Sequence, residues 1–336
     1  MNSPTPTGRP SPEPRAPADA MPRLVGDIGG TNARFALCGP DGQVREERKL
    51  PVADHPGLIE AAEAYLAGRK VRDAVFAVAT PVLGDTVAFT NSAWRFSIRA
   101  ARERLGLRDL AVINDFVAQA TAIPALGGED LRALKPGEAK AGRPRLVIGP
   151  GTGLGVAFLL PDGPASGGRG WRVAPSEAGH ASFAPQDALQ AELLRRLREI
   201  HGGHVSAERL VSGPGLLQTA RSLAEIRGTA IRYETPRDVS DRAAAGDCPT
   251  SAEAVRLFCF LLGSVAGNYA LTLLTEGGVH VTGGLCRNLG PLLDREELIR
   301  GFTAKGRFSG YLETIPIGQV LRPHTGLLGA ALHRHV

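Results

Sequence analysis

"LVGDIGGTNARFAL", residues 24–37, places a glycine-rich turn between two apolar runs. Leu24 and Ile28 precede the turn, and Phe35 and Leu37 follow it in alternation with polar or small residues. This spacing predicts strand, turn and strand, and it argues against the strand, turn and helix that open a dinucleotide-binding fold. Glycine lets backbone N–H groups approach phosphate oxygens closely, so the turn is a candidate phosphate-binding loop.

The same pattern returns in "RLVIGPGTGLGVAFLL", residues 145–160. Either turn alone could be a tight hairpin without a ligand, but two copies about 120 residues apart predict two related halves that both contact phosphate. The chain has no Gly-Lys dipeptide, which excludes the P-loop of nucleotide triphosphatases. Leu154 and Val156 stand where a dinucleotide fingerprint needs its third glycine, so NAD binding is disfavoured.

Length and composition predict a two-domain α/β protein. The 336 residues are 43% hydrophobic, and the formal net charge of +5 comes without a long block of Lys or Arg. We therefore expect no nucleic acid and no membrane partner. The four cysteines are far apart in the sequence, which predicts reduced thiols and a cytoplasmic location.

Two segments need separate interpretation. The N-terminal residues 1–21 are rich in proline, with six in the first 20 positions, which predicts a disordered tail. The apolar stretch 257–274 is as long as a membrane span, but Asn268 and Tyr269 lie inside it, so we expect a buried helix. "TSAE", residues 250–253, predicts a capping box at the start of this helix.

The remaining elements follow from hydrophobic periodicity and turn residues. We expect strands over 73–82, 109–116 and 277–285, and helices over 116–126, 191–200, 251–275 and 326–335. The last helix is expected to fold back on the first half of the chain.

Polar side chains in three motifs could carry chemistry. "VINDF" places Asn114 and Asp115 at the end of a strand, where α/β sheets present catalytic groups, although capping of the next helix is the simpler explanation. "SEAGH" supplies Glu177 and His180, and "HVSAERL" supplies Glu208. Solvated loop residues or a metal site are the alternatives, and a metal is weakly supported because no H-E-x-x-H motif is present.

Taken in order, the motifs "GDIGGTNARFAL", "TNSAWRFS", "INDF", "GPGTGLGVA", "SEAGHASFAP", "HVSAERLVSGPGL", "VTGGL" and "HTGLLGAA" resemble the bacterial glucokinases. These belong to the hexokinase, actin and Hsp70 superfamily, and the resemblance is to the proteobacterial type outside the ROK branch. It runs from about Leu24 to the C-terminus and leaves out the tail. Pro150 and Ala178 depart from common family residues, and the cysteine-rich zinc cluster of ROK proteins is missing.

The resemblance implies two ribonuclease H-like α/β domains around a central cleft. The smaller domain would comprise residues 22–125 with 322–336, and the larger would comprise 126–321. The implied reaction is transfer of the ATP γ-phosphoryl group to the 6-hydroxyl of D-glucose, with Asp115 accepting the hydroxyl proton. A kinase for another hexose, a non-catalytic sugar-responsive regulator and an actin-like or Hsp70-like ATPase are the alternatives.

The resemblance also implies the ligands, with ATP and Mg2+ as cofactors, glucose as substrate and a homodimer as a possible assembly. No residue is expected to bind the metal directly, and Asp27 would contact it through water. The implied glucose ligands are Asn114, Asp115, Glu177, His180 and Glu208. The implied ATP and Mg2+ contacts are Gly26, Asp27, Gly29, Gly30, Thr31, Asn32, Gly151, Thr152, Gly153, Gly283 and Gly284.

Overall fold

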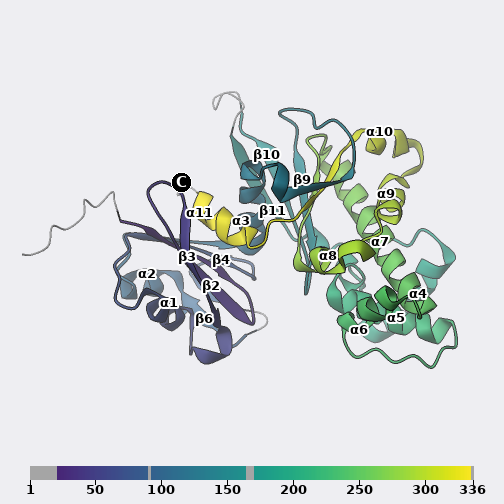
Figure 1. The fold of residues 1–336 in the computed structure, drawn as a ribbon, viewed down its shortest axis with the longest axis horizontal. Coiled ribbons are helices and arrows are strands. Elements are labelled where there is room, and N and C mark those ends of the chain that lie inside the picture. The colour runs from purple at the N-terminus through teal and green to yellow at the C-terminus, as the bar shows by residue number, and fades with distance from the viewer. Residues whose placement is uncertain (1–20, 90–91, 164–169, 334–336) are drawn as a thin grey trace, which may run out of the picture. The chain divides into compact units, whose positions relative to one another are not determined.

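The computed structural model describes residues 21–89, 92–163 and 170–333, and they form two compact units (Figure 1). The first unit ends at Ile113, and the second runs from Asn114 to His333. Nearly all of the predicted tail, and Thr90 and Asn91 of the "TNSAWRFS" motif, lie outside the described residues.

The first unit is built on a mixed five-stranded sheet. The strands follow the order β3-β2-β1-β4-β7, and β1 and β2 form the predicted antiparallel hairpin, in which Ile28 pairs with Ala33. β1 runs parallel to β4. The strand bounds are β1 Arg23–Ile28, β2 Asn32–Cys38, β3 Val44–Pro51, β4 Asp73–Val78 and β7 Asp109–Asn114.

Smaller elements complete the first unit. Its core packs α1 and a short hairpin against the sheet, with Phe35, Tyr65 and Phe76 among the fully buried side chains. The bounds are α1 Leu58–Leu66, β5 Thr86–Ala88, β6 Arg95–Ser97 and α2 Ile98–Arg104.

The second unit contains a six-stranded sheet in the order β11-β10-β9-β12-β13-β8. β9 and β10 form the second predicted hairpin, in which Pro150 pairs with Leu154, and β9 runs parallel to β12. From β11 to β13 the arrangement matches that of the first sheet, with β10 and β9 in the places of β2 and β1 and with β12 in the place of β4. This match confirms the prediction of two related halves. The bounds are β8 Leu131–Lys135, β9 Arg145–Pro150, β10 Leu154–Pro161, β11 Trp171–Ser176, β12 Val279–Val281 and β13 Ile317–Val320.

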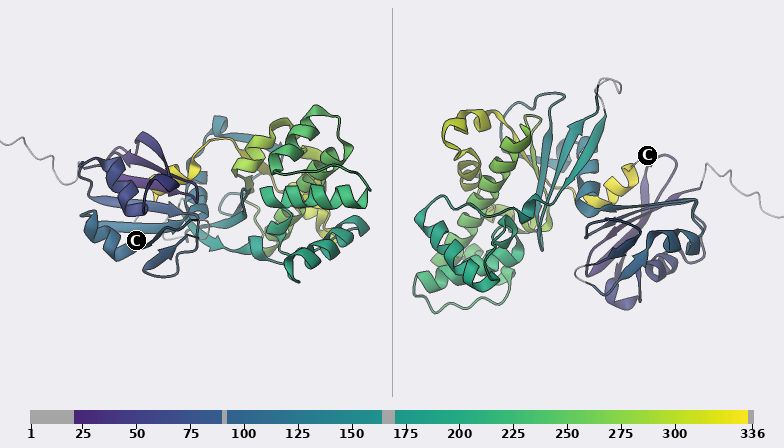
Figure 2. Two further views of the ribbon diagram at one scale, coloured as in Figure 1. Left: turned by 90° about the horizontal axis from the view of Figure 1, so that it is seen from below. Right: turned by 180° about the vertical axis from the view of Figure 1, so that it is seen from behind.

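Helices cover both faces of this second sheet (Figure 2). The long helix α7 packs in the larger core with Leu146, Ile148 and Val281, and α3 packs on the other face with Val147 and Leu159. The bounds are α3 Asp115–Ala122, α4 Ala188–His201, α5 Gly213–Ile226, α6 Pro236–Ala245, α7 Pro249–Leu273, α8 Gly284–Leu289, α9 Arg295–Thr303, α10 Ser309–Thr314 and α11 Thr325–Leu332.

The C-terminal helix α11 packs against α3, where Gly329 leaves no room for a Cβ atom beside the Ala118 carbonyl. This contact places both helices in the second unit. The observed grouping therefore differs from the expected domains, which assigned residues up to 125 and from 322 onwards to the smaller domain.

The apolar helix α7 is a core helix, as predicted. It is the one helix among the described residues with the length and hydropathy to cross a membrane, and 78% of its apolar window is buried. Gly263 and Gly267 pack against the backbone of α9, where a Cβ atom would collide with Leu298 or Phe302. The predicted capping box is wrong, because the helix begins with Cys248 as N-cap and Pro249 in the first turn, a position that suits proline.

All four cysteines are buried free thiols: Cys38, Cys248, Cys259 and Cys286. Burial raises the pKa of Cys259 to about 12 and also raises the pKa of Cys286.

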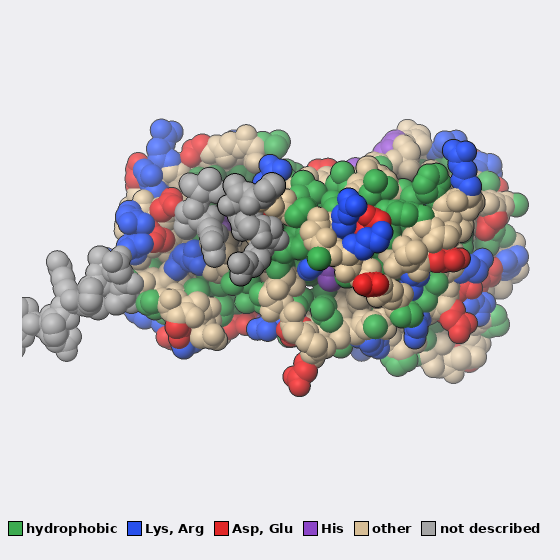
Figure 3. Space-filling model, turned by 90° about the horizontal axis from the view of Figure 1, so that it is seen from above, with side chains coloured by type: hydrophobic (Ala, Val, Ile, Leu, Met, Phe, Trp, Pro, Cys, Tyr) green, Lys and Arg blue, Asp and Glu red, His purple; other side chains and the backbone are tan. Residues whose placement is uncertain are grey.

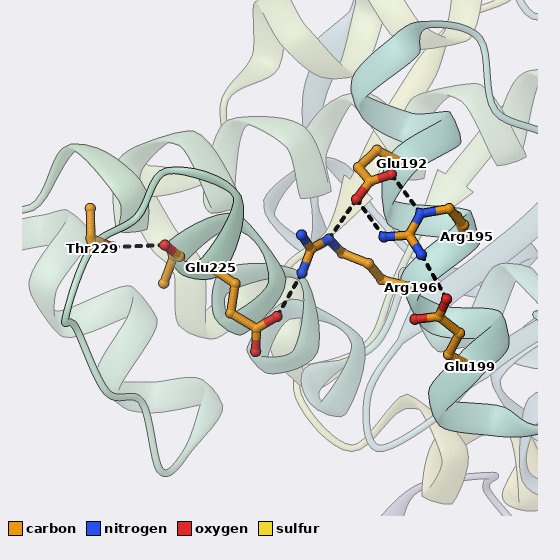
Figure 4. A network of polar contacts seen from close by, with 7 residues as sticks. Glu192, Arg195, Arg196, Glu199, Glu225 and Thr229 are labelled. Carbon is orange, nitrogen blue, oxygen red and sulfur yellow. Dashed lines mark hydrogen bonds and ion pairs between the residues drawn. The ribbon is translucent and has the colours of Figure 1, made fainter.

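A surface ion network joins α4 to α5 (Figure 4). Arg196 donates to Glu192 on its own helix at 2.8 Å and to Glu225 on α5 at 2.7 Å. Hydrogen bonds from Arg195 and Arg196 hold the pKa of Glu192 at about 2.

Candidate active site

The first glycine turn joins β1 to β2 within the first unit. Gly29 N donates to the carbonyl of Asn32 at 2.9 Å and closes the turn, while the Thr31 carbonyl accepts from Val52 N at 2.9 Å. Thr31 is exposed, and Asp27, in β1, pairs with Arg34. Thr31 supplies an exposed hydroxyl and Asp27 a carboxylate on the adjoining strand, and these groups suit phosphate with a hydrated cation.

Gly26 has a packing role that sequence reasoning missed. It is buried inside β1, where a Cβ atom would lie 2.9 Å from Phe76 Cδ1 and 3.1 Å from Ile28 Cδ1. The need for a small residue at this position therefore comes from the core of the first unit.

Asn114 and Asp115 lie at the junction of β7 and α3. Asn114 Oδ1 accepts from Phe116 N at 2.9 Å and from Val117 N at 3.4 Å, so this side chain is the helix cap. Asp115 Oδ1 also accepts from Phe116 N at 2.9 Å. The carboxylate of Asp115 is therefore held at the first turn of the helix.

Phe116 fixes the start of α3 on the second hairpin. Gly149 and Gly155 pair across β9 and β10, and the Phe116 ring packs on both. A Cβ atom on Gly149 would lie 2.7 Å from Phe116 Cζ, and one on Gly155 would overlap the ring. These two glycines make room for an aromatic ring. They differ from the loop glycines in that they pair with each other across the hairpin.

The second glycine turn is held at both ends. Gly151 N donates to the Gly153 carbonyl at 2.8 Å, and Gly213 N at the start of α5 donates to the Gly151 carbonyl at 2.8 Å. Leu154 N donates to Glu208 Oε2 at 2.8 Å. A Cβ atom on Gly151 would meet nothing within 4 Å, so this side of the turn is open, and Thr152 is exposed.

A polar group brings two loops together: Glu177 and His180 come from one loop, and Glu208 comes from another. His180 Nε2 is 3.8 Å from Glu177 Oε2, and His180 Nδ1 is 4.0 Å from Glu208 Oε1. Glu177 and His180 are more than half exposed, whereas the Glu208 side chain is 26% exposed. Carboxylate and imidazole groups directed to a common region can bind several hydroxyl groups of a polyol.

Backbone contacts hold these two loops together. Ala207 N donates to the Ala181 carbonyl at 2.8 Å, next to the 3-10 turn Ala178–His180. Tyr269 of α7 donates its hydroxyl to the Ala178 carbonyl, and burial raises the pKa of this phenol to about 12. Tyr269 therefore remains a neutral donor at physiological pH.

Gly283 and Gly284 follow β12. Gly283 has φ +94°, a conformation that favours glycine, and packs against the Pro150 carbonyl of the second turn. Gly284 begins α8 with no atom near its Cβ position. Thr282, just before them, donates to Gln119 of α3 at 3.1 Å, which adds a link between α3 and β12 that the sequence did not indicate.

The predicted site residues thus fall into two sets. Gly26, Asp27, Gly29, Gly30, Thr31 and Asn32 belong to the first unit, and the remaining ones belong to the second. Within the second unit, contacts connect the Asp115 helix start, the second glycine turn, the Glu177, His180 and Glu208 group and Gly283. Across the described ranges, no group of three or more His, Cys, Asp or Glu residues could hold a metal ion directly.

Comparison with known proteins identifies the family. The Glucokinase family model matches residues 24–335. A glucokinase of Aromatoleum aromaticum is 44% identical over 94% of this chain and 95% of its own length. The crystal structure of a glucokinase from an Antarctic psychrotroph is 34% identical, with a TM-score of 0.81 over 93% of this chain and 98% of that one. The fold is also that of a Balamuthia mandrillaris glucokinase solved with glucose, at 23% identity and a TM-score of 0.78, covering 93% of this chain and 92% of that chain. The chain, with its paired glycine hairpins and polar loops, belongs to the glucokinase family.

Proposed function

We propose that this glucokinase, in the ATP-dependent phosphorylation of glucose, uses Asp115 as the general base for the 6-hydroxyl. The observation that carries the proposal is the position of Asp115. Its carboxylate accepts a hydrogen bond from Phe116 N at the start of α3, and α3 is anchored on the second hairpin by the Phe116 ring. A base held in this way can accept the hydroxyl proton as the oxygen attacks the γ-phosphorus.

The sugar is oriented by the polar group of the second unit. Asn114, Glu177, His180 and Glu208 are assigned as glucose ligands, and their amide, imidazole and carboxylate groups can each accept or donate hydrogen bonds. Holding the 6-hydroxyl beside Asp115 replaces a bimolecular encounter with a positioned reaction.

The phosphate chain of ATP is assigned to the two glycine turns, with Gly283 and Gly284 on the adenosine side. Their backbone N–H groups, with the hydroxyls of Thr31 and Thr152, would stabilise the charge that develops on the transferred group. Asp27 fits a hydrated Mg2+ because a carboxylate next to the first glycine turn suits a hard cation that keeps its water ligands. Bound Mg2+ would supply charge neutralisation on the phosphates.

We assign both units to the ribonuclease H-like type, which the shared strand order of the two sheets supports. The scattered, buried cysteines support assignment outside the zinc-containing ROK branch, and their free thiols agree with a cytoplasmic location. Basic and acidic side chains are interspersed on the face shown in Figure 3, which suits a protein whose partner is a small molecule. We also propose a homodimer as the assembly of this chain.

A coupled assay tests the substrate assignment. Purified protein is given Mg·ATP and a panel of hexoses, and glucose is expected to have the highest kcat/KM. A higher value for another hexose would favour the alternative of a different hexose kinase. Sugar binding without turnover of any hexose would favour the non-catalytic regulator.

A further inference from the structure

The Leu154 peptide connects the second glycine turn to both polar loops. Its N–H donates to Glu208 Oε2 at 2.8 Å. Its carbonyl packs against Gly179 so closely that a Cβ atom on Gly179 could not be accommodated. Leu154, the first residue of β10 and directly after the predicted phosphate loop, therefore touches the segment that carries Glu177 and His180 as well as the side chain of Glu208.

Gly153 sets the position of the Glu208 carboxylate. A Cβ atom on Gly153 would lie 2.5 Å from Glu208 Oε2 and 3.2 Å from Glu208 Cδ. Gly153 does not have a left-handed φ, so the backbone would accept alanine. A methyl group at this position would push the end of the Glu208 side chain aside, because the carboxylate occupies that space.

The two oxygens of Glu208 have different neighbours. Oε2 accepts from the turn, whereas Oε1 is 4.0 Å from His180 Nδ1 in the polar group. Displacing the carboxylate from the turn would therefore also move the oxygen that faces His180.

From these contacts we infer that Gly153 and the Leu154 N–H group position Glu208 for glucose, so that the second phosphate loop also determines sugar affinity. The inference rests on the proposed role of Glu208 as a glucose ligand. Because one carboxylate holds the turn through Oε2 and faces His180 through Oε1, glucose and nucleotide should strengthen each other's binding, and thermodynamic linkage makes this effect reciprocal.

Two alanine variants in the same loop test the inference. Gly153→Ala places a methyl group on Glu208, and Gly151→Ala, the matched control, places one in open space within the proposed ATP site. Calorimetric titration of glucose without nucleotide should show Kd raised roughly tenfold in Gly153→Ala, the effect expected for loss of a hydrogen bond to a charged group. Gly151→Ala should keep its glucose Kd within about twofold of wild type and should raise only the KM for ATP, as a side effect on phosphate binding.

A glucose Kd in Gly153→Ala within twofold of wild type would overturn the inference. Failure of the underlying assignment would look different, because Glu208→Ala would then leave the glucose Kd unchanged. Circular dichroism and thermal unfolding establish that each variant is folded.

A second measurement does not require Gly153→Ala to fold. The Kd of the non-hydrolysable analogue AMPPNP with Mg2+, measured without sugar, should rise several-fold in Glu208→Ala because the Leu154 N–H loses its acceptor. Glu177→Ala is the control, since the contacts of Glu177 are to His180 and not to the turn. An unchanged AMPPNP Kd in Glu208→Ala would refute the coupling.

Discussion

Asp115 and Asp27 are both acids beside phosphate-binding candidates, but their surroundings differ. Asp115 is held at the start of α3, whereas Asp27 lies in β1 opposite Arg34. Replacing Asp115 with Asn keeps the shape and removes the proton acceptor, so kcat should fall by roughly 10²–10⁴ with glucose binding retained. Steady-state kinetics and calorimetric titration of glucose provide the two readouts.

Asp27→Asn serves as the comparison. It should raise the Mg2+ concentration needed for half-maximal rate, and excess Mg2+ should rescue it in part, which it should not do for Asp115→Asn. Retention of more than about a tenth of wild-type kcat in Asp115→Asn would leave that residue as a sugar ligand or cap only.

His280 on β12 should make stability depend on pH. Both ring nitrogens are buried without a hydrogen-bond partner among the described residues, and burial, with the Arg145 charge beside it, lowers its pKa to about 4. In the unfolded chain His titrates near its ordinary value of about 6.5, so the unfolded state binds more protons between these values. The free energy of unfolding should therefore fall by about 3 kcal/mol as pH drops from 6.5 to 4.

Urea unfolding at several pH values measures this slope. His280→Leu should flatten it, while the exposed His204→Leu should keep it. Equal slopes in wild type and His280→Leu would show that other groups cause the acid sensitivity.

At the level of elements, the anchor of α3 on the second hairpin can be tested by a double-mutant cycle. Gly155→Ala should destabilise the protein by about 1–3 kcal/mol because its methyl group overlaps the Phe116 ring. Phe116→Leu in the same chain should recover part of this loss, since the two changes share one contact. If the changes in the free energy of unfolding, measured with denaturant, are additive, Phe116 and Gly155 do not share a contact.

The hairpins were predictable because their alternation and turn glycines are local in sequence. β4 and β12 end earlier than predicted, at Val78 and Val281, because strand length depends on partner strands and on where the next helix begins. The cap role of Asn114 was among the sequence alternatives, but the Phe116 contact with Gly149 and Gly155 was not, because it joins residues distant in the chain.

At the scale of the whole molecule, the division between units could not be read from the sequence. A boundary near 125 was expected, yet α3 follows its contacts with β10, β11 and α11 and groups with the second unit. Such contacts depend on which faces meet in three dimensions, and periodicity alone does not encode them.

The site assignments predict a unit-specific response to ligands. All assigned glucose ligands lie in the second unit. In hydrogen exchange, glucose alone should protect residues 114–117, 176–183 and 205–213, while residues 28–33 of the first turn should gain protection only with Mg·AMPPNP. Protection of 28–33 by glucose alone would contradict the unit-specific response, and a lack of protection by Mg·AMPPNP would remove that turn from the proposed ATP site.

The four buried cysteines can report the order in which parts of the chain open. An alkylating reagent needs an exposed thiolate, so the native protein should react slowly and each thiol should be modified only when its surroundings open. Cys38 belongs to the first unit and the other three to the second. The order in which mass spectrometry finds them alkylated during mild heating should therefore reveal which unit opens first, without any introduced label.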